Sequence, residues 1–301
     1  MSKPIGVLIN PSSGRGYGKR AASQVWQALA AAGVETIDLA GGSYAADLAN
    51  ARKAVAEKAI AALLVVGGDG MVHLGVNALG GTDIPLAIVA TGTGNDGAVS
   101  LGLPVGDVAA AVQTSLENLQ SPRRVDLLAG RAYLGDFYAF GVVSAGFDAL
   151  VNARANRLKF PKGPSRYQVA LLLELLKFRG IHYKAVIDGK PRKIDAMLCA
   201  VANAPQFGAG MLIAPHARVD SGKLVLFIVH KMSRFELLRV FPSVYTGGHV
   251  NHRAVEFVNA DEVTLDSGNR PIFADGEYVG DAPVTVRIAP GALLVCAPRV
   301  A

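Results

Sequence analysis

The chain has 301 residues, more than one average domain, and 51% of them are hydrophobic, so two domains with sizeable cores are expected. Lys and Arg outnumber Asp and Glu by 30 to 24, and the formal net charge of +6 fits either nucleotide phosphates or an anionic membrane surface as partners, or simply a solvated surface, which is the commoner case for so modest a surplus. Neither an export signal nor an apolar segment long enough to span a bilayer is present, which predicts a cytoplasmic protein with at most peripheral membrane contact.

The N-terminal part of the sequence alternates short apolar strands with longer helical patterns, which is typical of a parallel sheet covered by helices. The expected elements are a strand at 5–10, a helix at 19–32, a strand at 35–39, a helix at 45–57, strands at 62–66 and 85–90, and a helix at 107–119. Gly33 is expected to end the first helix, and Asp107 to be the N-cap residue of the last. We therefore predict an α/β domain with a doubly wound parallel sheet over residues 1–124.

From residue 125 onward the pattern changes to short strand-like runs, which is typical of an antiparallel β-rich, sandwich-like domain. The runs lie at 125–129, 136–143, 183–187, 196–202, 223–229, 263–266, 270–274 and 285–288. Asp188-Gly189 and Asp275-Gly276 are expected to form two-residue hairpin turns. Helices are expected at 167–178 and near 233–240. This second domain is placed at 125–301, with its last residues able to pack back on the first domain.

The helix expected at 167–178 is apolar over most of its circumference and follows a basic run. The cations of that run are Arg154, Arg157, Lys159, Lys162 and Arg166. These features favour either contact with lipid chains and anionic head groups or an ordinary packed helix behind a solvated loop.

The two cysteines, Cys199 and Cys296, lie inside apolar runs. Their placement favours buried thiols in a reducing compartment over a disulfide or a zinc site. His216 is expected at the surface, because no second histidine lies at metal-binding spacing.

Three glycine-rich loops follow predicted strands of the first domain, and such loops lie at the edge where doubly wound sheets bind ligands. The first, Asn10 to Lys19, offers backbone N–H groups, hydroxyls and two cations ahead of a helix. Its glycine and lysine spacing differs from that of a P-loop, and the third glycine of the dinucleotide-binding pattern is missing. Alone, this loop indicates either a phosphate site or an ordinary flexible loop.

The second loop, Gly67 to Gly70, places Asp69 beside backbone amides at the end of a strand. A carboxylate there would repel phosphate unless a cation intervenes, which predicts a bridging Mg²⁺. The alternative is that Asp69 is a turn former or a helix cap. The third loop, Thr91 to Asp96, adds hydroxyls and a second carboxylate, and by itself it too could be a helix-capping turn.

Further motifs follow these loops in a fixed order. The full set is Asn10-Pro11-Ser12-Ser13-Gly14, Gly67-Gly68-Asp69-Gly70, Gly92-Thr93-Gly94-Asn95-Asp96, Leu101-Gly102-Leu103-Pro104, Val125-Asp126, Gly146-Phe147-Asp148, Phe207-Gly208-Ala209-Gly210-Met211, Ala214-Pro215, Ala274-Asp275-Gly276-Glu277 and Pro290-Gly291-Ala292-Leu293. It covers nearly the whole chain and resembles the diacylglycerol kinase catalytic-domain family. That family includes bacterial soluble lipid kinases, is similar to sphingosine and ceramide kinases, and shares its GGDG turn with NAD kinases.

The resemblance implies a kinase that phosphorylates the hydroxyl of diacylglycerol or a related lipid, met at the membrane surface, with its ATP site between the two domains. Residues 1–124 would then be the nucleotide-binding domain and residues 125–301 the lipid-substrate domain. ATP and Mg²⁺ are the implied cofactors, nucleic acid is not an expected partner, and a homodimer is left open. The candidate nucleotide-binding residues are Asn10, Ser13, Gly14, Gly67, Gly68, Asp69, Gly70, Thr91, Gly92, Thr93 and Asn95. By position, Asp96 and Asp126 would join an aspartate and magnesium network, and Asp69 and Asp220 are the candidate metal ligands.

The resemblance also implies that Glu277 is the general base. Phosphoryl transfer to an alcohol needs a group that accepts the hydroxyl proton as the oxygen attacks, and a glutamate fixed just after the Asp275-Gly276 turn can do so. Without the other motifs, the same residues would be read as a hairpin turn followed by an exposed glutamate.

Two departures from the family pattern leave other functions open. Met71, His73 and Leu74 replace polar residues after the GGDG turn, which leaves the nucleotide preference undecided, and Ser221 stands where bacterial relatives have a structural magnesium ligand. These departures make a catalytically weak lipid- or nucleotide-binding protein an alternative. The shared GGDG turn makes an NAD kinase-like enzyme another, and a dinucleotide-dependent oxidoreductase is disfavoured because the first loop lacks the third glycine.

Overall fold

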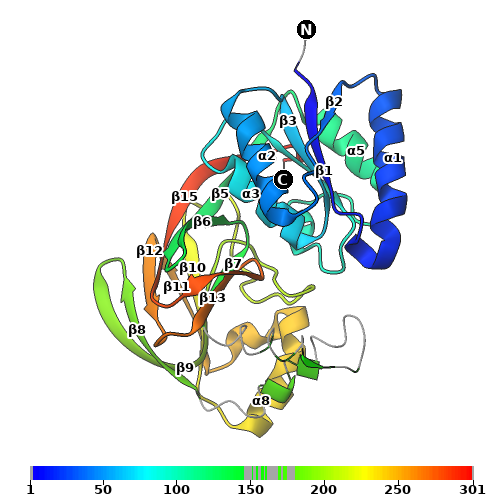
Figure 1. The fold of residues 1–301 in the computed structure, drawn as a ribbon. Helices are drawn as coiled ribbons and strands as arrows, with labels where there is room; N and C mark the ends of the chain where they lie inside the picture. Colours follow the sequence, from blue (N-terminus) through cyan, green and yellow to red (C-terminus); the bar gives the residue numbers. More distant parts are fainter. Residues whose placement is uncertain are drawn as a thin grey trace. The chain divides into compact units, whose positions relative to one another are not determined.

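The computed structural model describes residues 3–145 and 180–299, together with residues 151, 154, 157, 158, 160, 169, 170 and 172–174. The chain forms two compact units, of which the first holds Met1–Leu127 with Pro290–Ala301 and the second Leu128–Ala289 (Figure 1). The sequence predicts a boundary between residues 124 and 125, and the chain divides between Leu127 and Leu128. The C-terminal residues return to the first unit.

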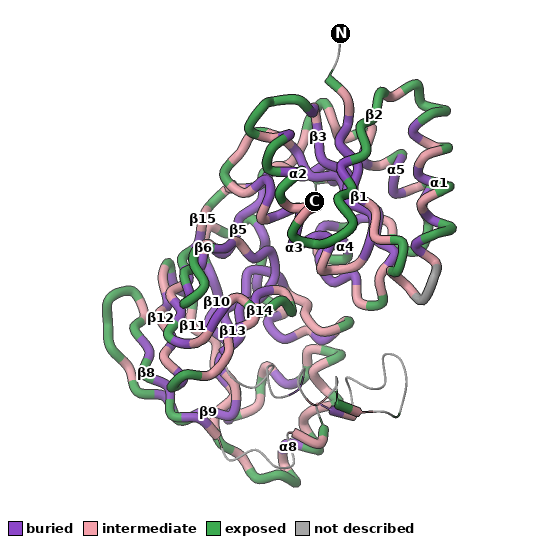
Figure 2. Tube along the Cα trace, viewed as in Figure 1, coloured by how far each residue is buried: buried purple, intermediate pink, exposed green. Residues whose placement is uncertain are grey.

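A parallel sheet forms the centre of the first unit, which confirms the predicted doubly wound domain. Its strands are β1 (Ile5–Ile9), β2 (Thr36–Asp38), β3 (Ala62–Gly67) and β4 (Leu86–Ala90), in the spatial order β2-β1-β3-β4, and the end of β15 (Val284–Val295) joins β4. Every residue of β3 is buried, whereas the short edge strand β2 is exposed throughout (Figure 2). Apolar strands covered on both faces are typical of parallel sheets.

Helices cover both faces of this sheet. They are η1 (Ser13–Gly16), α1 (Tyr17–Ala31), α2 (Tyr44–Ala56), α3 (Asp69–Leu79), α4 (Asp96–Ser100) and α5 (Val108–Glu117). α1 and α5 contact each other and share a core with Val7, Leu64 and Val89, while α2 and α3 contact each other and α3 approaches Val65, which points to the opposite face. Asp107 is confirmed as the N-cap of α5, because its carboxylate accepts the N–H of Ala110 at 3.0 Å.

The second unit is built from antiparallel strands, as predicted. They are β5 (Arg123–Ala132), which begins in the first unit, β6 (Gly135–Ala139), β7 (Val142–Ala145), β8 (Ile181–Ile187), β9 (Lys190–Ala202), β10 (Leu224–His230), β11 (Val255–Ala260), β12 (Glu262–Asp266), β13 (Pro271–Ala274) and β14 (Glu277–Asp281). The long strand β9 pairs with β8 along its first half, and with β7 and β10 along its second. Both predicted Asp-Gly turns are confirmed, with positive φ angles of 46° and 77° at Asp188-Gly189 and 51° and 90° at Asp275-Gly276.

The strand predicted at 136–143 is wrong as a single element, because the chain leaves the strand conformation between β6 and β7. The N–H groups of Phe140, Gly141 and Val142 all donate to the carboxylate of Asp275, at 2.8, 2.8 and 3.0 Å. A carboxylate that accepts hydrogen bonds from consecutive backbone N–H groups replaces the bonds that a neighbouring strand would otherwise make with them, so the strand ends there. β11 and β14 were not predicted from the sequence.

Two hydrophobic cores lie on opposite faces of β9 and β10. Cys199, Val201 and Leu226 point into one of them, while Ala200 and Phe227 point into the other. The second core is closed by α8 (Arg234–Val240) and η2 (Phe241–Thr246), and His249 of η3 (Gly248–Asn251) contacts the ring of Phe227 edge-on. α8 confirms the helix predicted near 233–240, and Ser233 is its N-cap.

The other predicted helix, at 167–178, is helical at residues 169, 170 and 172–174, and its remaining residues lie outside the described part. Lys159, Lys162 and Arg166 of the basic run also lie outside it. In the described part of the chain, no helix has the length and hydropathy that a bilayer crossing requires.

Both cysteines are buried, and each lies in a different core. Burial raises the pKa of Cys296 to about 12, and burial likewise raises that of Cys199. Both thiols are therefore protonated at neutral pH and serve as small apolar side chains.

Glu256 on β11 links this strand to β9 and β10, because its carboxylate interacts with Arg192 on β9 and His230 on β10. Arg192 donates to both of its carboxylate oxygens at 2.7 and 2.8 Å, and His230 lies 2.7 Å from one of them. The Arg192 guanidinium, helped by His230, lowers the pKa of Glu256 from 4.5 to about 2. The charged Glu256 carboxylate therefore stabilises the folded state fully above pH 4.5, the pKa that this residue has in the unfolded chain. This stabilisation is lost as the pH falls toward 2, where Glu256 is protonated in the folded protein as well.

We expect Glu256→Gln to lower the free energy of unfolding at pH 7 by about 2 kcal/mol, because a charge-assisted bond is lost. The difference from the wild type should shrink between pH 4.5 and 2, which urea denaturation across that range would measure. Glu262→Gln is the control, since it removes a more exposed pair with Arg287 and should cost less than about 1 kcal/mol. A Glu256→Gln deficit that stayed constant with pH would contradict this account.

Candidate active site

Three glycine-rich segments follow the carboxyl ends of β1, β3 and β4 in the first unit. We call residues 10–18 the first glycine loop, residues 67–70 the second and residues 91–96 the third. Since parallel strands end at one edge of their sheet, the three loops lie together there. Their contacts with one another define the candidate nucleotide site.

The first glycine loop is bonded to both of the others. The N–H of Asn10 donates to the carbonyl of Val66 at 2.9 Å, and the hydroxyls of Ser13 and Thr91 lie 2.7 Å apart. Gly14 has a φ of +56°, and a Cβ placed on it would lie 2.3 Å from the carbonyl oxygen of Thr91. A side chain at this position would therefore push the first loop away from the third.

The second and third glycine loops touch through their backbones. The N–H of Thr91 donates to the carbonyl of Gly67 at 2.8 Å. A Cβ on Gly92 would lie 2.4 Å from the Cα of Gly68, a distance at which one backbone would have to move. Glycine at both positions lets the two loops pack without side chains between them.

The Asp69 carboxylate fixes the third loop from the start of α3. One of its oxygens accepts the N–H of Asn95 at 2.9 Å, and the other accepts the N–H of Gly97 at 3.2 Å. Asp69 therefore caps α4, a helix whose own N-cap residue, Asn95, has a φ of 59° and makes no cap bond with its side chain. The side chain of Asn95 instead closes the loop on the N–H and carbonyl of Gly92, at 2.8 and 3.0 Å.

The remaining candidates of the first unit occupy different places around these loops. Gly70 lies half-buried in the first turn of α3, and Thr93 is exposed. Asp96 is the first residue of α4 and only 8% exposed. Asp126, on β5, is 4% exposed and accepts the N–H of Gly291 at 2.8 Å, so its carboxylate holds the returning C-terminal strand. Their roles in catalysis stay predictions.

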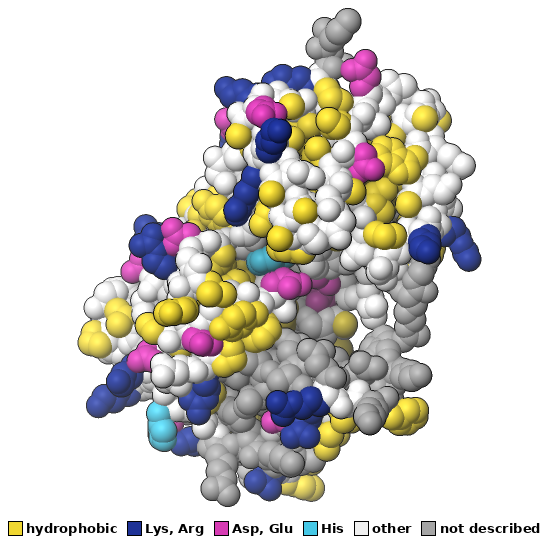
Figure 3. All heavy atoms as spheres, viewed as in Figure 1, with side chains coloured by type: hydrophobic (Ala, Val, Ile, Leu, Met, Phe, Trp, Pro, Cys, Tyr) yellow, Lys and Arg dark blue, Asp and Glu magenta, His cyan; other side chains and the backbone are white. Residues whose placement is uncertain are grey.

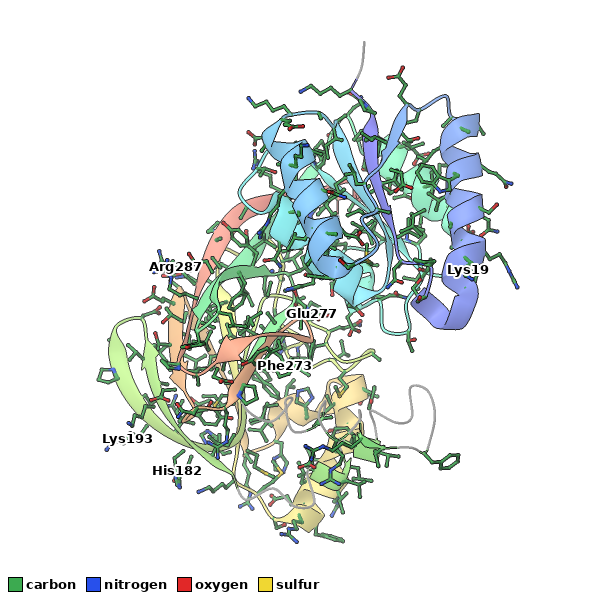
Figure 4. All side chains as sticks on the ribbon, in the orientation of Figure 1. Lys19, His182, Lys193, Phe273, Glu277 and Arg287 are labelled. Carbon is green, nitrogen blue, oxygen red and sulfur yellow. The ribbon has the colours of Figure 1, made fainter. Side chains whose placement is uncertain are left out.

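Glu277, the candidate general base, is an exposed residue of the second unit. It is the first residue of β14, directly after the Asp275-Gly276 turn, and pairs with Ala274 on β13 (Figure 4). The three amides bound by Asp275 fix that turn against the segment between β6 and β7. Glu277 therefore extends from a rigid hairpin, which suits a group that must meet a reacting hydroxyl.

Asp275 and Asn203 are two supporting residues whose roles were not predicted from the sequence. Asn203 is fully buried. Its side-chain amide donates to the carbonyl of Phe140 at 2.8 Å, and its backbone N–H donates to the carbonyl of Gly141 at 2.8 Å. Together they hold both sides of the segment on which the Glu277 hairpin rests. Asp275 was identified as a turn residue, and Asn203 gave only the weak signal of a polar residue ending an apolar run.

Among the residues that the structure describes, no three His, Cys, Asp or Glu side chains lie close enough together to bind a metal ion by themselves. The proposed metal ligands therefore do not form a site made of protein side chains alone. Asp69 and Asp220 belong to different units, and Asp220 accepts a bond from Arg218 at 3.2 Å. The hydroxyl of Ser221 donates to the carbonyl of Lys223 within a turn. Mg²⁺ in nucleotide sites is usually held by one or two carboxylates with the phosphates, and the glycine loops offer that number.

The residues that depart from the family pattern after the GGDG turn are buried in α3. Met71, His73 and Leu74 are 6%, 5% and 0% exposed. The ring of His73 lies 3.1 Å from the side-chain amide of Asn77, one helical turn further on. These three side chains pack inside the first unit, so the helix after the loop is anchored by apolar contacts.

An apolar cavity of about 100 Å³ lies in the second unit, over the outer face of β9 and β10. Met197, Phe227, Leu237 and Phe241 are among the residues that line it, with His249 as a polar one. Burial lowers the pKa of His249, while the carbonyl of Ile213, 3.2 Å from its ring, opposes this shift. The ring is thus uncharged at neutral pH, and the cavity suits hydrocarbon better than water.

Comparisons with known proteins match both units. A family model described as the diacylglycerol kinase catalytic domain matches residues 4–129, and one described as the YegS C-terminal NAD kinase beta sandwich-like domain matches residues 141–297. The chain is similar to a diacylglycerol kinase of Mycobacterium tuberculosis (strain ATCC 25618 / H37Rv), with 36% identity over 98% of this chain and 95% of that protein.

A second relative is a diacylglycerol kinase of Bacillus subtilis (strain 168), with 27% identity over 92% of this chain and 90% of that protein. The crystal structure of a diacylglycerol kinase from Bacillus anthracis str. Sterne has the same fold, with a TM-score of 0.74, 18% identity and coverage of 98% and 97% of the two chains.

Proposed function

Because the chain belongs to the diacylglycerol kinase catalytic-domain family of lipid kinases, we propose that it transfers the γ-phosphoryl group of ATP to the hydroxyl of diacylglycerol or a closely related lipid. The observation that carries this proposal is the set of three glycine loops, bonded to one another at the carboxyl edge of a parallel sheet. Such an edge, with glycines and a helix start, presents backbone N–H groups to a phosphate chain.

The residues of the loops suit a triphosphate in their chemistry. The contacts at Gly14, Gly68 and Gly92 keep side chains out of the space between the loops, and the first turn of α3 leaves N–H groups without helical acceptors. Asp96, with Asp69 beside it, would hold Mg²⁺ together with phosphate oxygens. When bound, the ion would neutralise charge on the transferring phosphoryl group.

Glu277 would act on the acceptor. As the lipid hydroxyl oxygen bonds to the γ-phosphorus and the bond from that phosphorus to the ADP oxygen breaks, the hydroxyl proton passes to the Glu277 carboxylate. Asp275 and Asn203 position this carboxylate by fixing the hairpin and the segment beside it. The apolar cavity of the second unit supports a lipid, rather than a small polar alcohol, as the owner of that hydroxyl.

Purified protein with labelled Mg·ATP and mixed micelles of diacylglycerol, sphingosine, ceramide and glycolipids, with NAD in a parallel reaction, would test the proposal. We expect label in phosphatidic acid. Label in NAD alone would favour an NAD kinase-like enzyme, an alternative that the description of the second family model keeps open. ATP binding without transfer to any acceptor would favour a binding protein and overturn the proposal.

A further inference from the structure

Helix α8 has apolar side chains on two opposite faces. Leu237 is buried, and it lines the apolar cavity together with Val240. On the other side Phe235 and Leu238, three residues apart and so on one face, are 79% and 40% exposed. A short helix that already buries one apolar face has no reason from folding to present a second one to water.

Two arginines border the exposed apolar pair. Arg234 and Arg239 are exposed, and neither has an ion pair among the residues that the structure describes. With Phe235 and Leu238 they form a surface that we call the α8 outer face (Figure 3 shows hydrophobic side chains and cations next to one another at this end of the second unit). Apolar side chains beside unpaired cations are typical of surfaces that enter an anionic lipid interface.

The acidic residue of the helix does not cancel this charge. Glu236 accepts bonds from Arg253 at 3.1 and 3.3 Å, and His252 lies 3.4 Å from the same oxygen. Its charge is therefore balanced by side chains that follow η3. The α8 outer face keeps the positive charge of Arg234 and Arg239, which is complementary to anionic head groups.

We infer that the α8 outer face docks the protein on an anionic membrane, with Phe235 and Leu238 among the acyl chains and Arg234 and Arg239 on the head groups. The inference rests on the proposed function, because a lipid acceptor has to be reached in its bilayer. The inner face of the same helix lines the apolar cavity through Leu237 and Val240, so the docking surface and the cavity lie on opposite sides of α8.

The test is the binding of the full-length protein to vesicles of phosphatidylcholine with and without phosphatidylglycerol, in the absence of ATP. We expect the wild type to prefer the anionic vesicles. Arg234→Gln with Arg239→Gln should weaken that binding by roughly 5-fold for each arginine, and this loss should disappear on neutral vesicles. Phe235→Ser with Leu238→Ser should weaken binding to both kinds of vesicle by at least about 10-fold.

Matched changes elsewhere in the second unit serve as controls. Lys184→Gln with Lys193→Gln removes two exposed cations from β8 and β9, and Tyr133→Ser with Leu134→Ser removes two exposed apolar side chains from the β5–β6 turn. Both control variants should bind vesicles like the wild type. Equal losses in the control and α8 variants, or no vesicle binding by the wild type, would overturn the inference.

Two further readouts separate the docking surface from the proposed activity and from another occupant. The α8 variants should phosphorylate a dispersed short-chain diacylglycerol at the wild-type rate but lose turnover on vesicles. If the wild type labelled no diacylglycerol but the α8 variants still bound vesicles more weakly than it does, the proposed function would be wrong and the docking surface would stand. A dimer in light scattering that the α8 changes dissociate, with vesicle binding unaltered, would assign the surface to a second copy instead.

Discussion

Glu277→Gln is expected to fold like the wild type and to lose turnover by about 10²- to 10⁴-fold, the usual contribution of a positioned general base. In the proposed reaction, the glutamine amide has the same shape as the carboxylate but cannot accept the proton of the lipid hydroxyl. Because the residue is exposed at the start of β14, and because Asp275 rather than Glu277 makes the bonds that hold the hairpin, the change removes little from stability. Steady-state assays with saturating ATP and lipid would measure it.

Glu262→Gln is the matched control for this experiment, since it makes the same chemical change at the start of another strand of the second unit. It should leave turnover within about 2-fold of the wild type, because a surface pair with Arg287 is all that it weakens. Turnover near the wild-type value in Glu277→Gln would remove this residue from the mechanism. An equal loss in both variants would point to a general effect on the second unit.

Gly92→Ala is expected to have the second large effect, on nucleotide binding. The new Cβ would lie 2.4 Å from the Cα of Gly68 and 2.9 Å from the side-chain oxygen of Asn95, so the second and third loops must separate. A displacement of this kind costs about 10²-fold in turnover, and we expect the affinity for ATP to fall at least 10-fold. Overpacking should also lower the free energy of unfolding by about 1–3 kcal/mol. Isothermal titration with ATP and thermal denaturation would measure the two effects.

Gly33→Ala controls for the loss of a glycine as such. Gly33 ends α1 with a φ of +65°, and a Cβ there would meet no atom within 4 Å. Its replacement should cost about 1 kcal/mol through backbone strain alone and leave ATP affinity unchanged. If Gly92→Ala bound ATP as tightly as Gly33→Ala, the contact between the loops would have no part in holding the nucleotide.

Local sequence patterns were enough to predict most of the fold. The buried run of β3 and the N-cap at Asp107 depend on neighbouring residues alone, and both are where the pattern indicates. The strand predicted through Phe140 failed for the opposite reason, since its end is set by Asp275, which lies 135 residues further along the chain. β14, which reads EYVGD, was hidden because its polar residues give no alternating apolar pattern.

The candidate site shows the same division between local and distant information. The glycine loops could be identified as phosphate-binding candidates, because glycine, hydroxyl and amide groups after a strand have a recognisable chemistry. The sequence left open whether Asp69 holds a metal or caps a helix. The two amides that its carboxylate accepts, those of Asn95 and Gly97, lie 26 and 28 positions later in the chain. Glu277 could be selected only through its resemblance to a family, because an exposed glutamate after a turn is otherwise unremarkable.

The bonds between the three glycine loops limit how this protein could be redesigned. The hydroxyls of Ser13 and Thr91 are hydrogen-bonded, the backbones of Gly92 and Gly68 are in close contact, and the carboxylate of Asp69 accepts the N–H of Asn95. The conformation of each loop therefore depends on the other two. A loop grafted singly from a kinase of different nucleotide preference would arrive without the neighbours that shape it. Engineering of cofactor choice should therefore exchange all three segments at once and keep the polar and glycine positions where they meet.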